Sequence, residues 1–115
     1  MVGELLEVKT LRDESGAQVL GLAGEVDLST APTLEKAILA ALGELTARTL
    51  VVDLTKVTFL ASAGMSALIA GRERAAEKGV EMVIAASPQG AAYRSLEIAG
   101  LVDVLRVRPE VTPPA

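Results

Sequence analysis

The chain has 115 residues, which suits one domain with one hydrophobic core, and half of its residues are hydrophobic. A formal net charge of −4 and an aromatic content of 2% argue against a nucleic-acid-binding surface. Cysteine and histidine are both absent, which excludes disulfides, thiol nucleophiles, histidine-based triads and the usual zinc sites. Only mechanisms that use carboxylates or lysine remain open to an enzyme.

The hydropathy pattern predicts no membrane segment. Residues 1–4 lack a basic segment followed by an apolar one, so no signal peptide is expected. The longest uncharged stretch, 57–71, is shorter than the roughly 20 residues that span a bilayer. These features predict a cytoplasmic domain.

The first elements along the chain are two strands and a helix. Alternating apolar residues predict strands over 5–10 and 18–22, and the polar segment between them predicts a β-hairpin turn. Apolar residues at helical spacing over 34–45 predict the first helix, with Ser29 or Thr30 as its N-cap.

The second half of the chain alternates strands with helices. The apolar run 50–52 predicts a buried strand that ends at Asp53. The further elements are a helix over 62–78, a strand over 80–86, a helix over 87–100 and a strand over 101–107. The inward face of the helix over 62–78 is expected to carry Met65, Leu68, Ile69, Ala75 and Ala76. The alternation predicts a single α/β domain with a mixed sheet.

The segment 53–64 carries the strongest indication of function. Ser62 begins a helix after a buried strand, and its neighbours Ala61, Ala63 and Gly64 are small enough to leave its hydroxyl open to a partner. The first turn of a helix also offers free amides and a positive dipole end, which suit a phosphate group. From spacing alone, an ordinary N-cap is the commoner role of such a serine. No glycine-rich phosphate loop or GxSxG elbow is present.

A second candidate is the segment after the second strand. Asp27 lies between a strand and a helix, where binding loops often lie. Taken alone, it is more often the acceptor of an Asx turn or a favourable charge at the helix dipole. An acid–base pair with Glu25 is disfavoured, because solvated carboxylates near strand ends are common.

The motifs in these segments resemble those of STAS domains, in particular the bacterial anti-sigma-factor antagonists. They are Gly24-Glu25-Val26-Asp27 running into Thr30-Ala31, then Asp53-Leu54-Thr55 with Val57, Phe59-Leu60 and Ser62-Ala63-Gly64, and finally Ala99-Gly100-Leu101. The likeness implies a single STAS-like domain over 3–107, with about three to four helices on a mixed sheet. Residues 108–115 are expected to form a flexible, proline-rich tail.

The resemblance implies a switch protein that is no enzyme and needs no metal or cofactor. In the family, the unphosphorylated antagonist binds an anti-sigma factor that is also a serine kinase, and so frees a sigma factor. Phosphorylation at the position of Ser62 breaks the complex, and a phosphatase restores it. Neither nucleic acid nor membrane is an expected partner. The expected partner-binding residues are Asp27, Thr30, Ala61, Ala63, Gly64 and Met65.

Three features depart from the family pattern. Ala61 stands where an aspartate commonly precedes the serine, which removes a carboxylate that could meet the kinase. Ala63 stands where a serine or threonine commonly follows, and the tail lacks the usual further helix. Two alternatives remain: a STAS module that docks in a transporter or stress-sensing complex without phosphorylation, and a small enzyme. The oligomeric state is left open.

Overall fold

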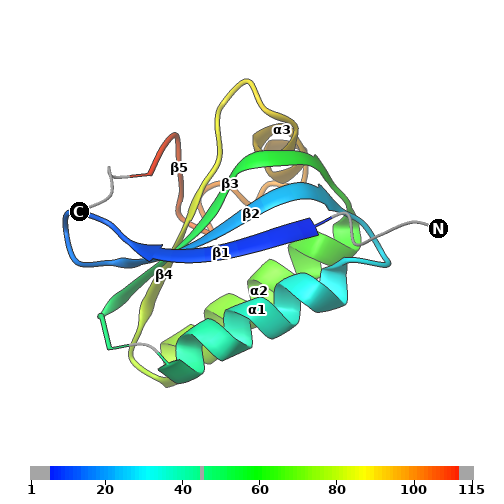
Figure 1. The fold of residues 1–115 in the computed structure, drawn as a ribbon. Coiled ribbons are helices and arrows are strands. Elements are labelled where there is room, and N and C mark those ends of the chain that lie inside the picture. Colours follow the sequence, from blue (N-terminus) through cyan, green and yellow to red (C-terminus); the bar gives the residue numbers. More distant parts are fainter. Residues whose placement is uncertain (1–5, 45, 112–115) are drawn as a thin grey trace.

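The computed structural model describes residues 6–44 and 46–111 (Figure 1). Within these ranges the elements are β1 (Leu6–Arg12), β2 (Gln18–Val26), α1 (Ala31–Glu44), β3 (Thr49–Leu60), α2 (Ser62–Glu77), β4 (Glu81–Ala85), α3 (Ala91–Ile98) and β5 (Val107–Arg108). The order confirms the alternation of strands and helices expected from the sequence. Arg108 lies in β5, and residues 112–115 of the expected tail lie outside the described residues.

The five strands form one mixed sheet in the order β1-β2-β3-β4-β5. β1 is antiparallel to β2, as the predicted hairpin requires, and the other neighbours are parallel. These pairings confirm the mixed sheet expected from the sequence. The hairpin turn between β1 and β2 is held by Asp13, whose Oδ1 accepts hydrogen bonds from the amides of Ser15 (2.9 Å) and Ala17 (3.0 Å).

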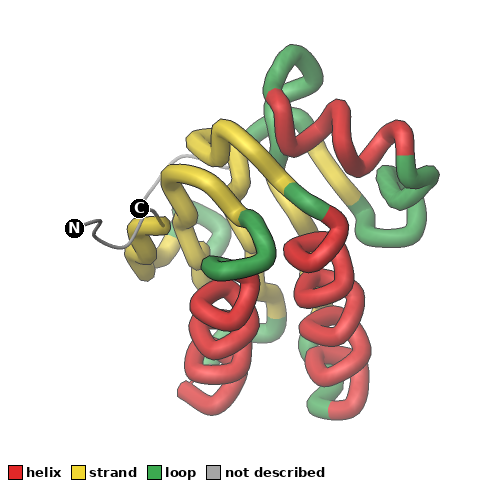
Figure 2. The backbone as a smooth tube through the Cα atoms, turned by 90° about the vertical axis from the view of Figure 1, so that its right-hand side faces the viewer, coloured by secondary structure: helices red, strands yellow, loops and turns green. Residues whose placement is uncertain are grey.

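Two helices cover one face of the sheet. α1 and α2 lie side by side below it, whereas α3 lies apart from them, beside β3 (Figures 1 and 2). The main core joins the helices to alternate residues of the central strands, such as Leu50 and Val52. The residues between them face the other side, where a smaller apolar cluster is formed by Ala17, Val19, Val51, Val83 and Ala85.

β3 is longer than expected. The prediction that it ends at Asp53 is wrong, because the strand continues to Leu60. Its register against β2 shifts between Gly21 and Ala23 and again between Gly24 and Glu25, which accommodates extra residues on the β3 side. Asp53 Oδ1 accepts hydrogen bonds from the amide (2.9 Å) and hydroxyl (2.7 Å) of Thr55, which stabilises the first irregularity.

The C-terminal part also differs from expectation. The strand expected over 101–107 is wrong, since turns occupy most of this segment and β5 covers only Val107–Arg108. α3 begins after Gly90 rather than at Ser87. Among the described residues, no helix is both long and apolar enough to cross a bilayer.

The inward face of α2 is only partly as expected. Leu68 and Ala75 are buried, but Ile69 is 37% exposed and Ala76 is exposed. The residues missed are Gly64, Ala67 and Gly71, which are buried. A Cβ atom at Gly71 would lie 2.9 Å from Ile38 Cγ2 of α1, so close packing of the two helices requires small residues on this face.

Candidate functional site

The site forms where β2 and β3 end together and α2 begins. Val26 and Leu60 are neighbours in the sheet, and the amide of Ala61 donates a 2.8 Å hydrogen bond to the carbonyl of Val26. The first turn of α2 then rests on these two strand ends. A Cβ at Gly64 would lie 2.5 Å from Val26 Cγ1 and 2.7 Å from Leu60 Cδ1, so this approach needs glycine.

Ser62 is the first residue of α2, and the N-cap position belongs to Ala61. The N-cap interpretation of Ser62 is therefore wrong. Ala61 has extended backbone angles (φ −87°, ψ 169°) because its amide still pairs with β2, while its side chain provides no cap. The carbonyl of Ala61 accepts from the amides of Gly64 (3.0 Å) and Met65 (3.1 Å).

The uncapped start of α2 leaves an anion-compatible surface around an exposed hydroxyl. The amides of Ser62 and Ala63 have no hydrogen-bond acceptor among the described residues. The Ser62 side chain is exposed. Free amides at the positive end of a 16-residue helix favour negative charge there.

The loop between β2 and α1 is a closed hydrogen-bond network. Asp27 Oδ1 accepts from the Ser29 amide (2.9 Å), the Ser29 hydroxyl (2.8 Å) and the Thr30 amide (3.0 Å). In return, Thr30 Oγ1 accepts from the Asp27 amide (2.9 Å) and donates to the carbonyl of Glu25 (2.8 Å). The hydrogen bond from the Ser29 hydroxyl, followed by that from the Thr30 amide, lowers the pKa of Asp27. The Asx turn expected as the structural role of Asp27 is confirmed.

A shallow groove of about 390 Å³ lies between α2 and the start of α1, with Leu28 of this loop beside it. On one side it is lined by Leu28, Ala31, Pro32 and Glu35, and on the other by Ala63, Ser66, Ala67 and Ala70. Leu28 is 81% exposed at its rim, and Phe59 is 49% exposed at the end of β3. Ser62 is exposed and directly precedes Ala63, which lines the groove.

The residues expected to bind a partner gather at this point but differ in accessibility. Asp27, Ala61, Ala63 and Met65 are half-buried, whereas Thr30 and Gly64 are buried. The last two shape the site from beneath and offer no side-chain surface to a partner. Sequence reasoning missed Leu28, although an apolar residue in a polar loop before a helix is a signal that could have found it.

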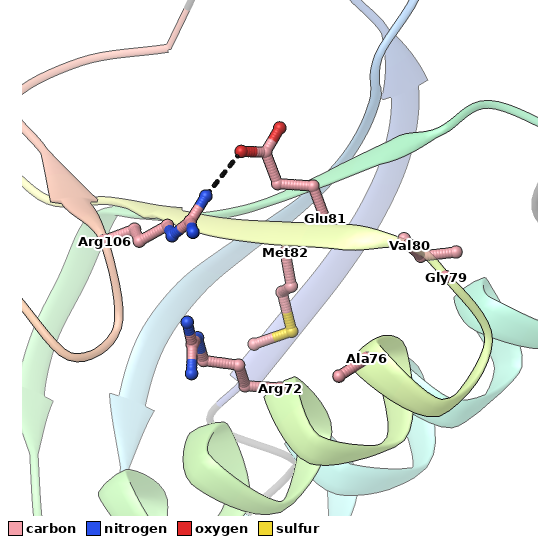
Figure 3. A pocket seen from close by; sticks show the side chains of 7 residues that line it. All are labelled: Arg72, Ala76, Gly79, Val80, Glu81, Met82 and Arg106. Carbon is pink, nitrogen blue, oxygen red and sulfur yellow. Dashed lines mark hydrogen bonds and ion pairs between the residues drawn. The ribbon is translucent and has the colours of Figure 1, made fainter.

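Another hollow, of about 310 Å³, lies near the C-terminal end of α2 (Figure 3). Arg72 and Arg106 extend into it, and Arg106 Nη1 forms a 2.8 Å ion pair with Glu81 Oε2. The rise of a helix puts this end about 20 Å from Ser62, so the hollow is separate from the site. Across 6–44 and 46–111, no group of three or more acidic side chains could hold a metal ion.

Comparison with known proteins shows which family the chain resembles. The family model described as the STAS domain matches residues 9–112. The anti-sigma-F factor antagonist RsfB of Mycobacterium tuberculosis is 44% identical over 68 residues, covering 56% of this chain and 52% of that protein. The chain thus spans about half the length of the curated relatives it matches.

Solved structures show the same fold. An anti-sigma factor antagonist from Mycobacterium paratuberculosis superposes with a TM-score of 0.79 at 32% identity, covering 92% of this chain and 87% of that one. The Bacillus cell fate determinant SpoIIAA in its phosphorylated form gives a TM-score of 0.64, covering 92% and 91% of the two chains. Its 14% identity limits that likeness to the fold. Since the family match spans nearly all of the described residues, the chain belongs to the STAS domain family.

Proposed function

We propose that this chain is an anti-sigma-factor antagonist, a binding module that acts in the cytoplasm and is controlled by phosphorylation of Ser62. The observation that carries the proposal is the exposed Ser62 hydroxyl at an uncapped helix start, beside an apolar groove. The names of the mycobacterial relatives at 44% and 32% identity support the same role.

In the unphosphorylated state, the groove and the loop around Asp27 bind an anti-sigma factor with serine kinase activity, which releases a sigma factor. The exposed Leu28 side chain and the alanines of the groove provide apolar contact. Asp27 Oδ1 is occupied within the loop, and Oδ2 accepts no hydrogen bond among the described residues, which leaves it for a partner donor. Thr30 holds the loop in the binding shape.

Phosphorylation switches the module off. The kinase transfers the γ-phosphoryl group of ATP to Ser62 Oγ, the hydroxyl proton passes to a base of the kinase, and ADP leaves. The phosphate adds about −1.5 to −2 charges, which the free amides of Ser62 and Ala63 accommodate in the unbound chain. In the complex the same group is bulky and must lose water, and a cost of roughly 4 kcal/mol weakens binding about a thousandfold. A phosphatase restores the binding form.

The test is incubation of the chain with ATP and an anti-sigma factor of the kinase type, followed by peptide mass spectrometry and a binding assay. We expect one phosphate on Ser62 and loss of the complex. Ser62→Ala should bind without being modified. Ser66→Ala is the matched control for the position of the phosphate, because Ser66 is also exposed and lies one helical turn further along α2, and it should be phosphorylated on Ser62 like the wild type.

Three results would contradict the proposal. One is a phosphate on another residue, with Ser62→Ala still modified. Another is phosphorylation of Ser62 that leaves the complex intact. The third is stable binding with no phosphate on the chain, which would indicate a docking module without this switch.

A further inference from the structure

β1 is an edge strand whose outer side is open. Among the described residues it pairs with β2 alone, and the front edge of the sheet in Figure 1 is formed by this strand. α1 packs against β2 and β3, so the helical layer is set back from the edge. Val8 and Leu11 of β1 are each 41% exposed. The edge thus combines unpaired backbone with accessible apolar side chains.

The hairpin geometry shows which backbone groups face outward. The amide of Asp13 donates a 3.0 Å hydrogen bond to the carbonyl of Ala17, so the backbone groups of residue 13 point toward β2. In an antiparallel pair the backbone groups of successive residues point alternately toward and away from the neighbouring strand. The β1–β2 register continues without a shift, so the outward groups are those of Leu6, Val8, Thr10 and Arg12. No described residue bonds to them.

Charge limits how this edge can pair with a second copy of itself. In an antiparallel pair with two-fold symmetry perpendicular to the sheet, facing residues have their side chains on the same side of the sheet. The axis therefore lies midway between one residue of β1 and the same residue of the second copy. An axis at Lys9 opposes two lysines, and one at Glu7 opposes two glutamates. An axis at Thr10 places Glu7 opposite Asp13. An axis at Leu11 places Lys9 opposite Asp13, but that carboxylate is buried and accepts hydrogen bonds within the hairpin turn.

The axis at Val8 gives a complementary register. Glu7 then faces Lys9 of the second copy twice over, Val8 faces Val8, and Leu6 faces Thr10. Because Leu6, Val8 and Thr10 carry the outward backbone groups, this register also forms about six hydrogen bonds between the copies. A lysine on an edge strand ordinarily discourages pairing. Here the glutamate in matching register selects one alignment instead.

We propose that the chain forms a homodimer through antiparallel pairing of β1 with β1, centred on Val8, which joins the two five-stranded sheets. The symmetry reverses the strand direction between copies. The two Ser62 sites, which follow the ends of β2 and β3, therefore lie at opposite ends of the dimer and both stay accessible. The dimer does not depend on the role proposed for Ser62.

The experiment is sedimentation equilibrium of the full chain from about 10 μM to about 1 mM, with charge-reversal variants of β1. Glu7→Lys places lysine opposite lysine at two positions, and Lys9→Glu places glutamate opposite glutamate at two positions. Each variant should therefore weaken self-association about tenfold or more. An equimolar mixture of the two variants restores both ion pairs and should associate as a heterodimer. Glu97→Lys and Lys78→Glu, at exposed positions outside β1, change the net charge equally and should leave association unchanged.

A second variant tests the backbone pairing. Val8→Pro removes an outward amide and no hydrogen bond to β2, a substitution that edge strands tolerate. It should give a folded monomer. A monomer at every concentration of the wild-type chain would overturn the proposal. So would a dimer that is unaffected by the β1 charge reversals, or equal association of the mixed and single charge variants.

Discussion

The polar residues of the site are held in place in different ways. Thr30 is 3% exposed and its hydroxyl serves two backbone groups, so it fixes the loop from within. Ser62 has no such side-chain partner and is positioned by backbone pairing of Ala61 with Val26. Because backbone hydrogen bonding alone positions Ser62, its hydroxyl has no structural role within the described part of the chain and can accept a phosphoryl group.

Loss of the Thr30 hydroxyl should open the loop. Thr30→Val keeps the side-chain volume but leaves the Asp27 amide and the Glu25 carbonyl without their partner, which should lower the free energy of unfolding by about 1–3 kcal/mol. Thr30→Ser keeps the hydroxyl and should cost less than about 1 kcal/mol, for one lost methyl group. Urea denaturation of both variants measures the difference, and equal stabilities would argue against the network.

Asp13 should make stability depend on pH in acid. Burial raises its pKa, but hydrogen bonds from the Ser15 hydroxyl and the Ala17 and Ser15 amides, with the Arg108 charge, bring it below its usual value of 3.8. A carboxyl whose pKa is lower in the folded chain stabilises it above the unfolded pKa. That stabilisation is lost as pH falls from about 4 through the folded pKa.

Asp13→Asn should therefore be less stable than the wild type at pH 7, and the difference should shrink below about pH 4. Thermal unfolding between pH 2 and 7 measures the effect. Glu14→Gln removes an exposed neighbouring carboxylate and is the control, with little change expected at any pH. A constant difference between Asp13→Asn and wild type across this range would contradict the assignment.

At the scale of elements, the small residues of α2 determine how closely the helix approaches its neighbours. Gly64 allows contact with Val26 and Leu60, and Gly71 allows contact with Ile38 of α1. These positions form an inward stripe that hydropathy alone does not reveal, so hydropathy places Ile69 on the inward face and leaves Ala67 out. Packing distance, rather than hydrophobicity, selects the residues of this face.

Gly64→Ala should displace the first turn of α2. The new Cβ would overlap Val26, whose side chain is fully buried and cannot move aside, so the free energy of unfolding should fall by about 1–3 kcal/mol. Phosphorylation of Ser62 should slow as well, because the turn that presents it shifts. Gly43→Ala, in α1 with nothing within 4 Å of its Cβ, is the matched control. It should stabilise by up to about 1 kcal/mol; a similar gain at position 64 would contradict the close approach.

At the scale of the whole molecule, the groove and the free edge of the sheet lie on different elements. The groove is built from α1, α2 and the loop before α1, while the edge is β1. The proposed partner and the proposed second copy would therefore occupy separate surfaces of the domain. Leu28 is an exposed apolar residue that lines the groove, whereas Ile98 is an equally exposed apolar residue on α3, outside the groove.

Leu28→Ser should weaken binding of the anti-sigma factor about tenfold, because the side chain at the groove rim is expected to be buried in the complex. Stability should be nearly unchanged, since Leu28 is 81% exposed. Ile98→Ser is the matched control on α3, where the side chain is 83% exposed, and should leave binding intact. Isothermal titration calorimetry measures both. Equal losses for the two variants would exclude the groove as the docking surface.

Local signals in the sequence determined the order of the elements, the hairpin turn at Asp13, the helix that ends before Gly79 and the family motifs around Ser62. Each depends on residue spacing within a short segment, which the chain carries wherever it folds. Contacts between distant segments decided the rest. The hydrogen bond between the Ala61 amide and the Val26 carbonyl places the N-cap at Ala61 rather than at Ser62. Pairing with β2 extends β3 to Leu60, and the packing of α2 beside α1 forms the groove next to Leu28. These features depend on which elements become neighbours, so only the tertiary structure could decide them.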